Sequence, residues 1–153
     1  SGPAVVLGAG GAARAVVAAL IEVGVPEIHL ANRTRPRADA LRSDFGAKIH
    51  VHEWVQGANL MDDAVTVVNT TSLGMTGKPD MTVSLHRLNP HALVNDLVYT
   101  PLKTQFLIEA EERGAKVVDG LGMLLHQAAP GFERWFGLRP EVDEATRQAV
   151  LSA

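Results

Sequence analysis

The chain has 153 residues, of which 46% are hydrophobic, 20% charged and 5% aromatic, and its net charge is −3. This length fits one globular domain, and the charge gives no electrostatic reason to expect a nucleic-acid or membrane partner. No apolar stretch approaches the roughly 18–20 residues that span a bilayer. The absence of cysteine excludes disulfides and thiolate metal sites and is compatible with a cytoplasmic protein.

Short apolar runs alternate with segments of helical period along the chain. Strands are expected, in chain order, at residues 4–7, 28–31, 48–52, 65–69, 92–96 and 116–119. Helices are expected at about 12–23, 36–45, 104–113, 121–137 and 141–151. Residues 70–90 predict a long loop with one short helix at most. Because parallel neighbours need crossovers, this order predicts an α/β fold, a doubly wound and mostly parallel six-stranded sheet with helices on both faces.

A glycine-rich turn joins the first expected strand to the first expected helix. Gly8, Gly10 and Ala13 match the pattern G-x-G-x-x-G/A in the strand–turn–helix context where it binds dinucleotides. Gly8 permits the tight turn, Gly10 lets a pyrophosphate approach the backbone, and Ala13 lets helix and strand pack closely. The amides of the helix start would then face the phosphates. The alternative is a glycine-rich turn without a ligand, but the context favours a Rossmann-type domain that binds a dinucleotide.

Three arginines follow the second expected strand, in the segment Asn32-Arg33-Thr34-Arg35-Pro36-Arg37. An NAD site, like many S-adenosylmethionine sites, places Asp or Glu here to bind the ribose hydroxyls, and this segment has neither. Guanidinium groups instead bind a 2′-phosphate. A solvated basic turn is the alternative reading. The position and the lack of an acid favour NADP over NAD and argue against a methyltransferase.

Four segments together resemble the C-terminal, NADP-binding half of the shikimate dehydrogenase family. They are Gly8–Ala13 with Asn32-Arg33-Thr34, Asn69-Thr70-Thr71-Ser72-Leu73-Gly74-Met75, Asp96-Leu97-Val98-Tyr99 with Pro101–Thr104, and Asp119–Leu124 with Gln127-Ala128. The segments occur in the family's order, and the resemblance spans nearly the whole chain. The resemblance implies hydride transfer between NADP(H) and shikimate/3-dehydroshikimate, a step of aromatic amino-acid biosynthesis.

The resemblance also implies residue roles. The phosphate loop would comprise Gly8, Ala9, Gly10, Gly11, Ala12 and Ala13. Arg33 and Arg37 would bind the 2′-phosphate, and Asn32 and Thr34 would surround the adenosine ribose. Further cofactor contacts would come from Thr70, Thr71 and Ser72, and the nicotinamide end would be lined by Leu97, Val98 and Gly120. Tyr99 and Gln127 would reach the substrate, although a loop anchor and a surface group are their alternative readings.

The resemblance places the family's catalytic lysine and aspartate in an N-terminal substrate domain. We expect that domain to be absent from residues 1–153, which would form one NADP-binding domain without catalytic residues. The chain alone should therefore bind NADP and lack turnover, because the reaction needs an acid–base group beside the substrate hydroxyl. The full-length protein is expected to be a monomer or homodimer. Two alternatives stay open: a quinate/shikimate dehydrogenase of broader specificity, and a non-catalytic module that senses NADP.

Two smaller patterns remain. His50 and His52 lie on one face of an expected strand, at a spacing that can hold a metal. No third ligand is evident, so we expect exposed strand histidines and no metal site. Asp96 and Asp119 each end an apolar strand, where we expect them to fix loop amides rather than transfer protons.

Overall fold

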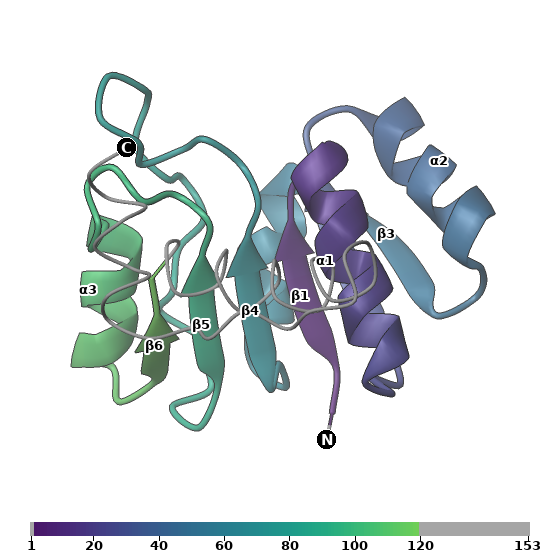
Figure 1. Ribbon diagram of the computed structural model, residues 1–153. Coiled ribbons are helices and arrows are strands. Elements are labelled where there is room, and N and C mark those ends of the chain that lie inside the picture. Colours follow the sequence, from purple (N-terminus) through teal and green to yellow (C-terminus); the bar gives the residue numbers. More distant parts are fainter. Residues whose placement is uncertain (1, 120–153) are drawn as a thin grey trace, which may run out of the picture.

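The computed structural model describes residues 2–119, in which strands alternate with helices (Figure 1). The strands are β1 (Ala4–Leu7), β2 (Ile28–Asn32), β3 (Ile49–Glu53), β4 (Thr66–Asn69), β5 (Leu93–Asp96) and β6 (Lys116–Val118). The helices are α1 (Gly11–Glu22), α2 (Arg35–Phe45), α3 (Gln105–Glu112) and a 3-10 helix, η1 (Trp54–Leu60). Between residues 2 and 119, no helix combines the length and the apolar character needed to cross a bilayer.

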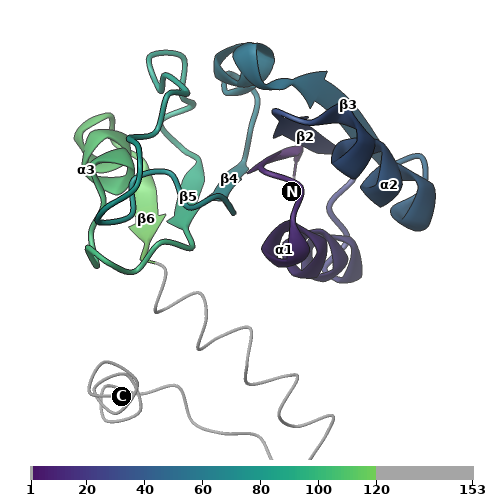
Figure 2. The same ribbon diagram turned by 90° about the horizontal axis from the view of Figure 1, so that it is seen from above.

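The six strands form one sheet in the order β3-β2-β1-β4-β5-β6, and every neighbouring pair is parallel. This confirms the predicted doubly wound α/β fold. Helices α1 and α2 cover one face of the sheet, whereas α3 and η1 pack on the other (Figures 1 and 2). The strand order reverses at β1, which is hydrogen-bonded to β2 on one side and to β4 on the other.

The observed elements begin and end within about two residues of the predicted ones. Helix α2 carries Pro36 in its first turn and ends at Gly46, whose φ of 93° ordinary residues rarely adopt. Residues 70–92 contain neither helix nor strand, as the glycines and prolines predict. The helices predicted at 121–137 and 141–151 lie outside the described residues.

The 3-10 helix η1 was not predicted, because its sequence reads as a short polar stretch. A capping box starts it: the Glu53 side chain accepts a hydrogen bond from the backbone of Gln56, whose side chain accepts from the Glu53 amide at 3.2 Å. Gly57 then lies so close to the core that a Cβ there would be 3.3 Å from Val83. These local interactions place η1 directly after β3.

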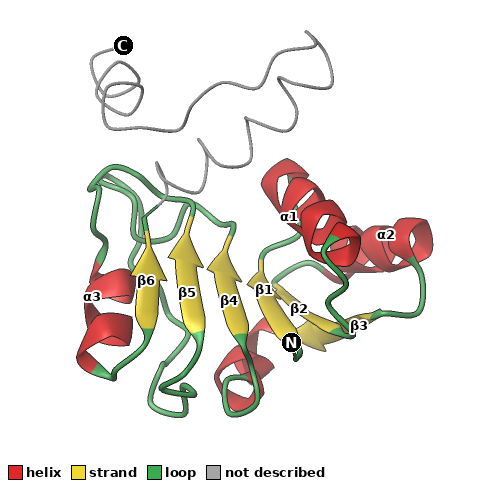
Figure 3. Ribbon diagram, turned by 60° about the horizontal axis from the view of Figure 1, so that its bottom comes forward, coloured by secondary structure: helices red, strands yellow, loops and turns green. Residues whose placement is uncertain are grey.

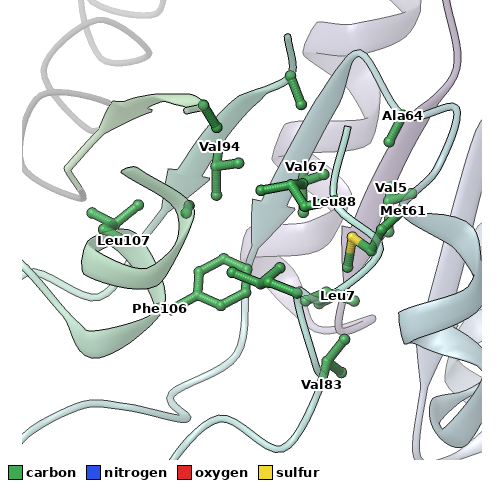
Figure 4. Packing of buried hydrophobic residues seen from close by; sticks show 14 of the residues in the cluster. Val5, Leu7, Met61, Ala64, Val67, Val83, Leu88, Val94, Phe106 and Leu107 are labelled. Carbon is green, nitrogen blue, oxygen red and sulfur yellow. The ribbon is translucent and has the colours of Figure 1, made fainter. Parts of the chain in front are cut away.

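Two apolar cores flank the sheet. The first lies between the sheet and α3, and it includes Leu7, Met61, Phe106 and Leu107 (Figure 4). The second lies beneath α1 and α2. Helix α1 contributes Ala13, Val16 and Val17 to it, a spacing that places all three on one helical face. Burying each of the larger side chains contributes about 1.5–3 kcal/mol, so the cores hold the carboxyl ends of the strands in fixed positions.

Three histidines form a cluster on the face of β2 and β3 opposite α1 and α2. The His29 Nδ1 and His52 Nε2 atoms are 2.9 Å apart, and the His29 ring stacks on His50 with centroids 5.1 Å apart. His50 and His52, which were predicted to share one face of a strand, thus form a histidine cluster with His29 of the neighbouring strand. Burial lowers the pKa of His52, and the neighbouring His29 and His50 lower it further. Glu27 contributes a carboxylate 3.4 Å from His29.

This cluster predicts a loss of stability in mild acid. A depressed pKa means that His52 takes up a proton less readily in the folded chain than in the unfolded one. Its stabilising contribution is therefore complete above 6.5 and is lost as pH falls from 6.5 towards the lowered pKa. The free energy of unfolding, measured in urea, should fall more steeply over this range for the wild type than for His52→Gln.

His91→Gln provides the control, since His91 is exposed and lies outside the cluster. That variant should keep the wild-type dependence on pH. Equal slopes for the wild type and His52→Gln would contradict the assignment.

Candidate functional site

The loops that carry the predicted site residues leave the sheet at one edge. Because all six strands are parallel, the loops that follow β1, β2, β4 and β5 all start at their carboxyl ends (Figure 3). The chain leaves β1 towards the face covered by α1, whereas the connection from β5 to β6 packs α3 on the opposite face. In open α/β sheets, connections to opposite faces create a crevice outside the strand ends where ligands bind, so we take this crevice region as the candidate site.

Gly8, directly after β1, packs tightly against Thr70 and Thr71, which follow β4. Its φ is 106°, and a Cβ atom there would lie 2.6 Å from Thr70 Oγ1 and 3.0 Å from Thr71 Cγ2. Thr70 is held in place, since its hydroxyl donates to the Leu7 carbonyl at 2.7 Å and its amide donates to the same oxygen at 2.9 Å. Both the conformation and the lack of space therefore require glycine at this position.

The amino terminus of α1 opens onto the crevice. Gly10 is its N-cap residue, and no side chain caps the helix. A Cβ at Gly10 or Gly11 would meet nothing within 4 Å, so a ligand can approach the backbone here. Ala13, by contrast, is fully buried and allows α1 to pack on the sheet. An uncapped helix start with small residues around it is suited to binding an anion through its amides.

In the arginine turn (residues 32–37, from the end of β2 into the first turn of α2), the arginines differ in their contacts. Arg35 faces two carboxylates, with Arg35 Nη1 3.4 Å from Glu53 and Nε 3.8 Å from Asp39. Neither Arg33 nor Arg37 forms an ion pair with any residue between 2 and 119, and both are exposed. The two arginines predicted to bind phosphate are therefore not neutralised by a carboxylate of the described residues.

Other contacts shape this turn. The Asn32 side-chain amide donates to the Thr34 carbonyl at 2.7 Å and to its hydroxyl at 3.0 Å, which fixes the backbone around Arg33. The Arg33 guanidinium lies over the Trp54 indole, with its Cζ 5.3 Å from the ring centroid. Trp54 was not among the predicted site residues. Its position directly after β3, at the same edge as the other loops, is the signal that could have identified it.

A buried network of polar side chains joins β4, β5 and α3. Asn69 donates to Asp96 Oδ1 at 3.0 Å, and the Asn69 side-chain carbonyl oxygen accepts from the Thr71 amide and hydroxyl at 2.9 and 2.6 Å. Asp96 also accepts from the Val98 amide at 2.9 Å and from the Thr104 hydroxyl at 2.7 Å. Asp96 thus fixes a loop amide, as predicted for it. The link from Asn69 to Thr104 through this carboxylate was not predicted.

Asp96 is fully inaccessible to solvent. Burial raises the pKa of its carboxyl above the usual 3.8, and the three hydrogen bonds that it accepts partly oppose this rise. Both carboxylate oxygens of Asp96 accept hydrogen bonds from groups that fix the loops after β4 and β5. This supports a structural role at the base of the crevice rather than contact with a ligand.

The remaining predicted residues lie along the loops after β4 and β5. Ser72 is exposed, and Thr71 and Leu97 are half-buried. Val98 is buried, whereas Tyr99 is 49% exposed. Gly120 and Gln127 lie outside the described residues. Within residues 2–119, no group of three or more histidine, aspartate or glutamate side chains is arranged to hold a metal ion.

A model of the shikimate / quinate 5-dehydrogenase family matches residues 2–98, and a model of the shikimate 5′-dehydrogenase C-terminal domain matches residues 120–151. The chain belongs to the shikimate / quinate 5-dehydrogenase family. The family assignment confirms the resemblance inferred from the four sequence segments.

Individual relatives agree with this assignment. A Cereibacter sphaeroides protein named shikimate dehydrogenase (NADP(+)) is 76% identical over 153 residues, which is 100% of this chain and 55% of that protein. The structure of a quinate dehydrogenase from Corynebacterium glutamicum in complex with NAD has a TM-score of 0.85 and 31% identity, covering 99% of this chain and 55% of that one. Shikimate 5-dehydrogenase from Thermus thermophilus, in complex with NADP(H) and shikimate, has a TM-score of 0.74 and 39% identity, covering 90% and 50%. The chain spans about half the length of the curated relatives it matches.

The Asp96 network predicts a large effect on stability. Asp96→Ala leaves the Val98 amide and the Thr104 hydroxyl buried without their acceptor, at a cost of about 1–3 kcal/mol each. The free energy of unfolding should therefore fall by about 2 kcal/mol or more in urea titrations.

Asp96→Asn is the matched control. It keeps one acceptor oxygen and should lose less stability than Asp96→Ala. Because the pKa of Asp96 is raised in the folded chain, the unfolded chain releases this proton first as pH rises above 3.8. The free energy of unfolding of the wild type should therefore fall over this range relative to that of Asp96→Asn. An Asp96→Ala variant as stable as the wild type would contradict the role assigned to this network.

Proposed function

We propose that this chain is the NADP-binding part of a shikimate dehydrogenase, an oxidoreductase that transfers hydride between NADP(H) and shikimate/3-dehydroshikimate. The observation that carries the proposal is the pair of exposed arginines, Arg33 and Arg37, that have no carboxylate partner among the described residues. Arg33 directly follows β2, the strand next to β1, and Arg37 lies in the first turn of α2. The uncapped start of α1, which follows β1, and these two arginines therefore offer two anion sites at the carboxyl ends of neighbouring strands, as a pyrophosphate and a 2′-phosphate require.

The roles of the residues follow from their positions. The backbone of Gly8 to Ala13 would bind the pyrophosphate through the amides at the start of α1. Asn32 and Thr34 would contact the adenosine ribose, and Arg33 and Arg37 the 2′-phosphate. Further along the edge, Thr70, Thr71 and Ser72 would flank the cofactor. Leu97, Val98 and Gly120 would line the nicotinamide end, with Tyr99 and Gln127 towards the substrate.

The residues present fit this cofactor. A Cβ at Gly10 would meet open space, as a site for close approach of a pyrophosphate requires, and the guanidinium of Arg33 is 5.3 Å from an indole ring but opposite no carboxylate of the described residues. When bound, the nicotinamide supplies the hydride acceptor or donor. The chain's own contribution is to bind and orient the dinucleotide. For residues 1–153 alone we expect cofactor binding without turnover, because we assign no acid–base group for the substrate hydroxyl to this chain.

A quinate dehydrogenase that uses NAD is the second candidate. The relative with a TM-score of 0.85 is a quinate dehydrogenase in complex with NAD, so the same fold accommodates that cofactor. The charge at the end of β2 favours NADP. A 2′-hydroxyl calls for a carboxylate acceptor there, and Glu53, which ends the neighbouring β3, is 3.4 Å from Arg35 and engaged with it.

Calorimetric titration with NADP and with NAD tests the proposal. The wild type should bind NADP more tightly than NAD. Arg33→Asp should weaken NADP binding by about tenfold or more, since a charge-assisted hydrogen bond contributes about 1.5–3 kcal/mol. It should not weaken NAD binding, because a carboxylate at this position can accept hydrogen bonds from the ribose hydroxyls.

Arg35→Gln is the matched control, because it removes a positive charge from the same turn but one that Glu53 and Asp39 already neutralise. It should change NADP affinity far less than Arg33→Asp. A wild type that prefers NAD, or equal losses in the two variants, would contradict the cofactor assignment.

A further inference from the structure

Trp54 supplies an aromatic ring to the arginine turn. It is the first residue of η1, which follows β3 directly and therefore begins at the same sheet edge as the turn after β2. The Arg33 Cζ atom lies 5.3 Å from the centroid of the Trp54 ring. This distance is within the range of a cation–π contact, and tryptophan is the strongest aromatic partner for such a contact.

The Trp54 indole is itself fixed. Its Nε1–H donates to the hydroxyl of Thr82 at 2.8 Å, and its ring is half-buried against the apolar core between the sheet and α3. Thr82 belongs to the long connection between β4 and β5. Arg33, in contrast, is exposed and has no ion pair with a described residue. The exposed Arg33 side chain thus contacts an indole ring whose position is fixed by Thr82 and by the apolar core.

The contact with Trp54 leaves the Arg33 guanidinium able to bind an anion. Within residues 2–119 no hydrogen bond uses an Arg33 N–H group, so these donors can bind a phosphate while the cation lies over the indole. A guanidinium already ordered by the ring loses less side-chain entropy when the phosphate binds. The contact with Trp54 therefore favours a phosphate ligand of Arg33 without competing for the same atoms.

We propose that Trp54 is a positioning residue that holds Arg33 for the 2′-phosphate and so sets the preference for NADP over NAD. Thr82 supports it by fixing the plane of the indole. This inference rests on the proposed function, because it takes Arg33 as the ligand of the 2′-phosphate. Trp54 acts through Arg33 and has no part in binding the pyrophosphate or the nicotinamide.

The test is a calorimetric titration of the full chain with NADP and with NAD. Its variants separate the effect of the aromatic face of Trp54 from the effect of its apolar volume. Trp54→Leu keeps an apolar side chain against the core but removes the π face. It should weaken NADP binding by about fivefold, the equivalent of a cation–π contact at an exposed site, and leave NAD binding unchanged. Trp54→Phe keeps an aromatic face and should restore most of the NADP affinity.

Two further variants complete the design. Thr82→Val removes the acceptor of the indole N–H and should cause a smaller loss of NADP affinity than Trp54→Leu. In an Arg33→Ala background, Trp54→Leu should cause no additional loss. Urea unfolding of each variant checks that it is folded, and Thr82→Val, an exposed change of similar shape, keeps the test valid if Trp54→Leu does not fold.

The outcomes distinguish this inference from the function on which it rests. Equal losses of NADP and NAD affinity in Trp54→Leu, or a loss that persists without Arg33, would overturn the positioning role alone. Wild-type affinity in Trp54→Leu would do the same. A wild type that does not bind NADP would overturn the proposed function and this inference with it.

Discussion

The close approach of Gly8 to Thr70 is the constraint on which the candidate site depends. At this point the ends of β1 and β4 come so near each other that a Cβ on residue 8 would be 2.6 Å from the threonine hydroxyl. The hydroxyl in turn is tied to the Leu7 carbonyl at 2.7 Å. From this fixed junction the chain turns into α1 on one face of the sheet, while the loop after β4 runs past the other side. The crevice at the sheet edge follows from that divergence.

At this edge two acids are engaged by partners, whereas Arg33 and Arg37 form no ion pair within residues 2–119. Asp96 is buried and accepts hydrogen bonds from Asn69, Val98 and Thr104, and Glu53 is paired with Arg35. Arg33 instead lies against an indole, which leaves its N–H edges available. Together with the uncapped start of α1, this distribution of charge is what supports our proposal that an anionic cofactor binds here.

The fold was predictable because its signals are local. Apolar runs such as residues 4–7 and glycines such as Gly8 and Gly46 determine strands and turns by short-range sterics. The alternation of strands with helical segments then predicts a parallel sheet, whereas the strand order itself comes from the structure. The contacts of Trp54 with Arg33 and Thr82 were not predictable, because they join residues far apart in the chain through side-chain packing. The hydrogen bond from Thr104 to Asp96 spans only eight residues, but it was not predictable either, because it depends on how the start of α3 packs against the end of β5.

An experimental structure of the chain with NADP tests the central claim most directly, namely that the crevice at the carboxyl ends of β1, β2 and β4 binds this dinucleotide. We predict the pyrophosphate on the amides between Gly10 and Ala13, and the 2′-phosphate within hydrogen-bonding distance of Arg33, with its guanidinium still over the Trp54 ring. A cofactor bound elsewhere on the sheet, or a 2′-phosphate that faces solvent away from Arg33, would contradict the account.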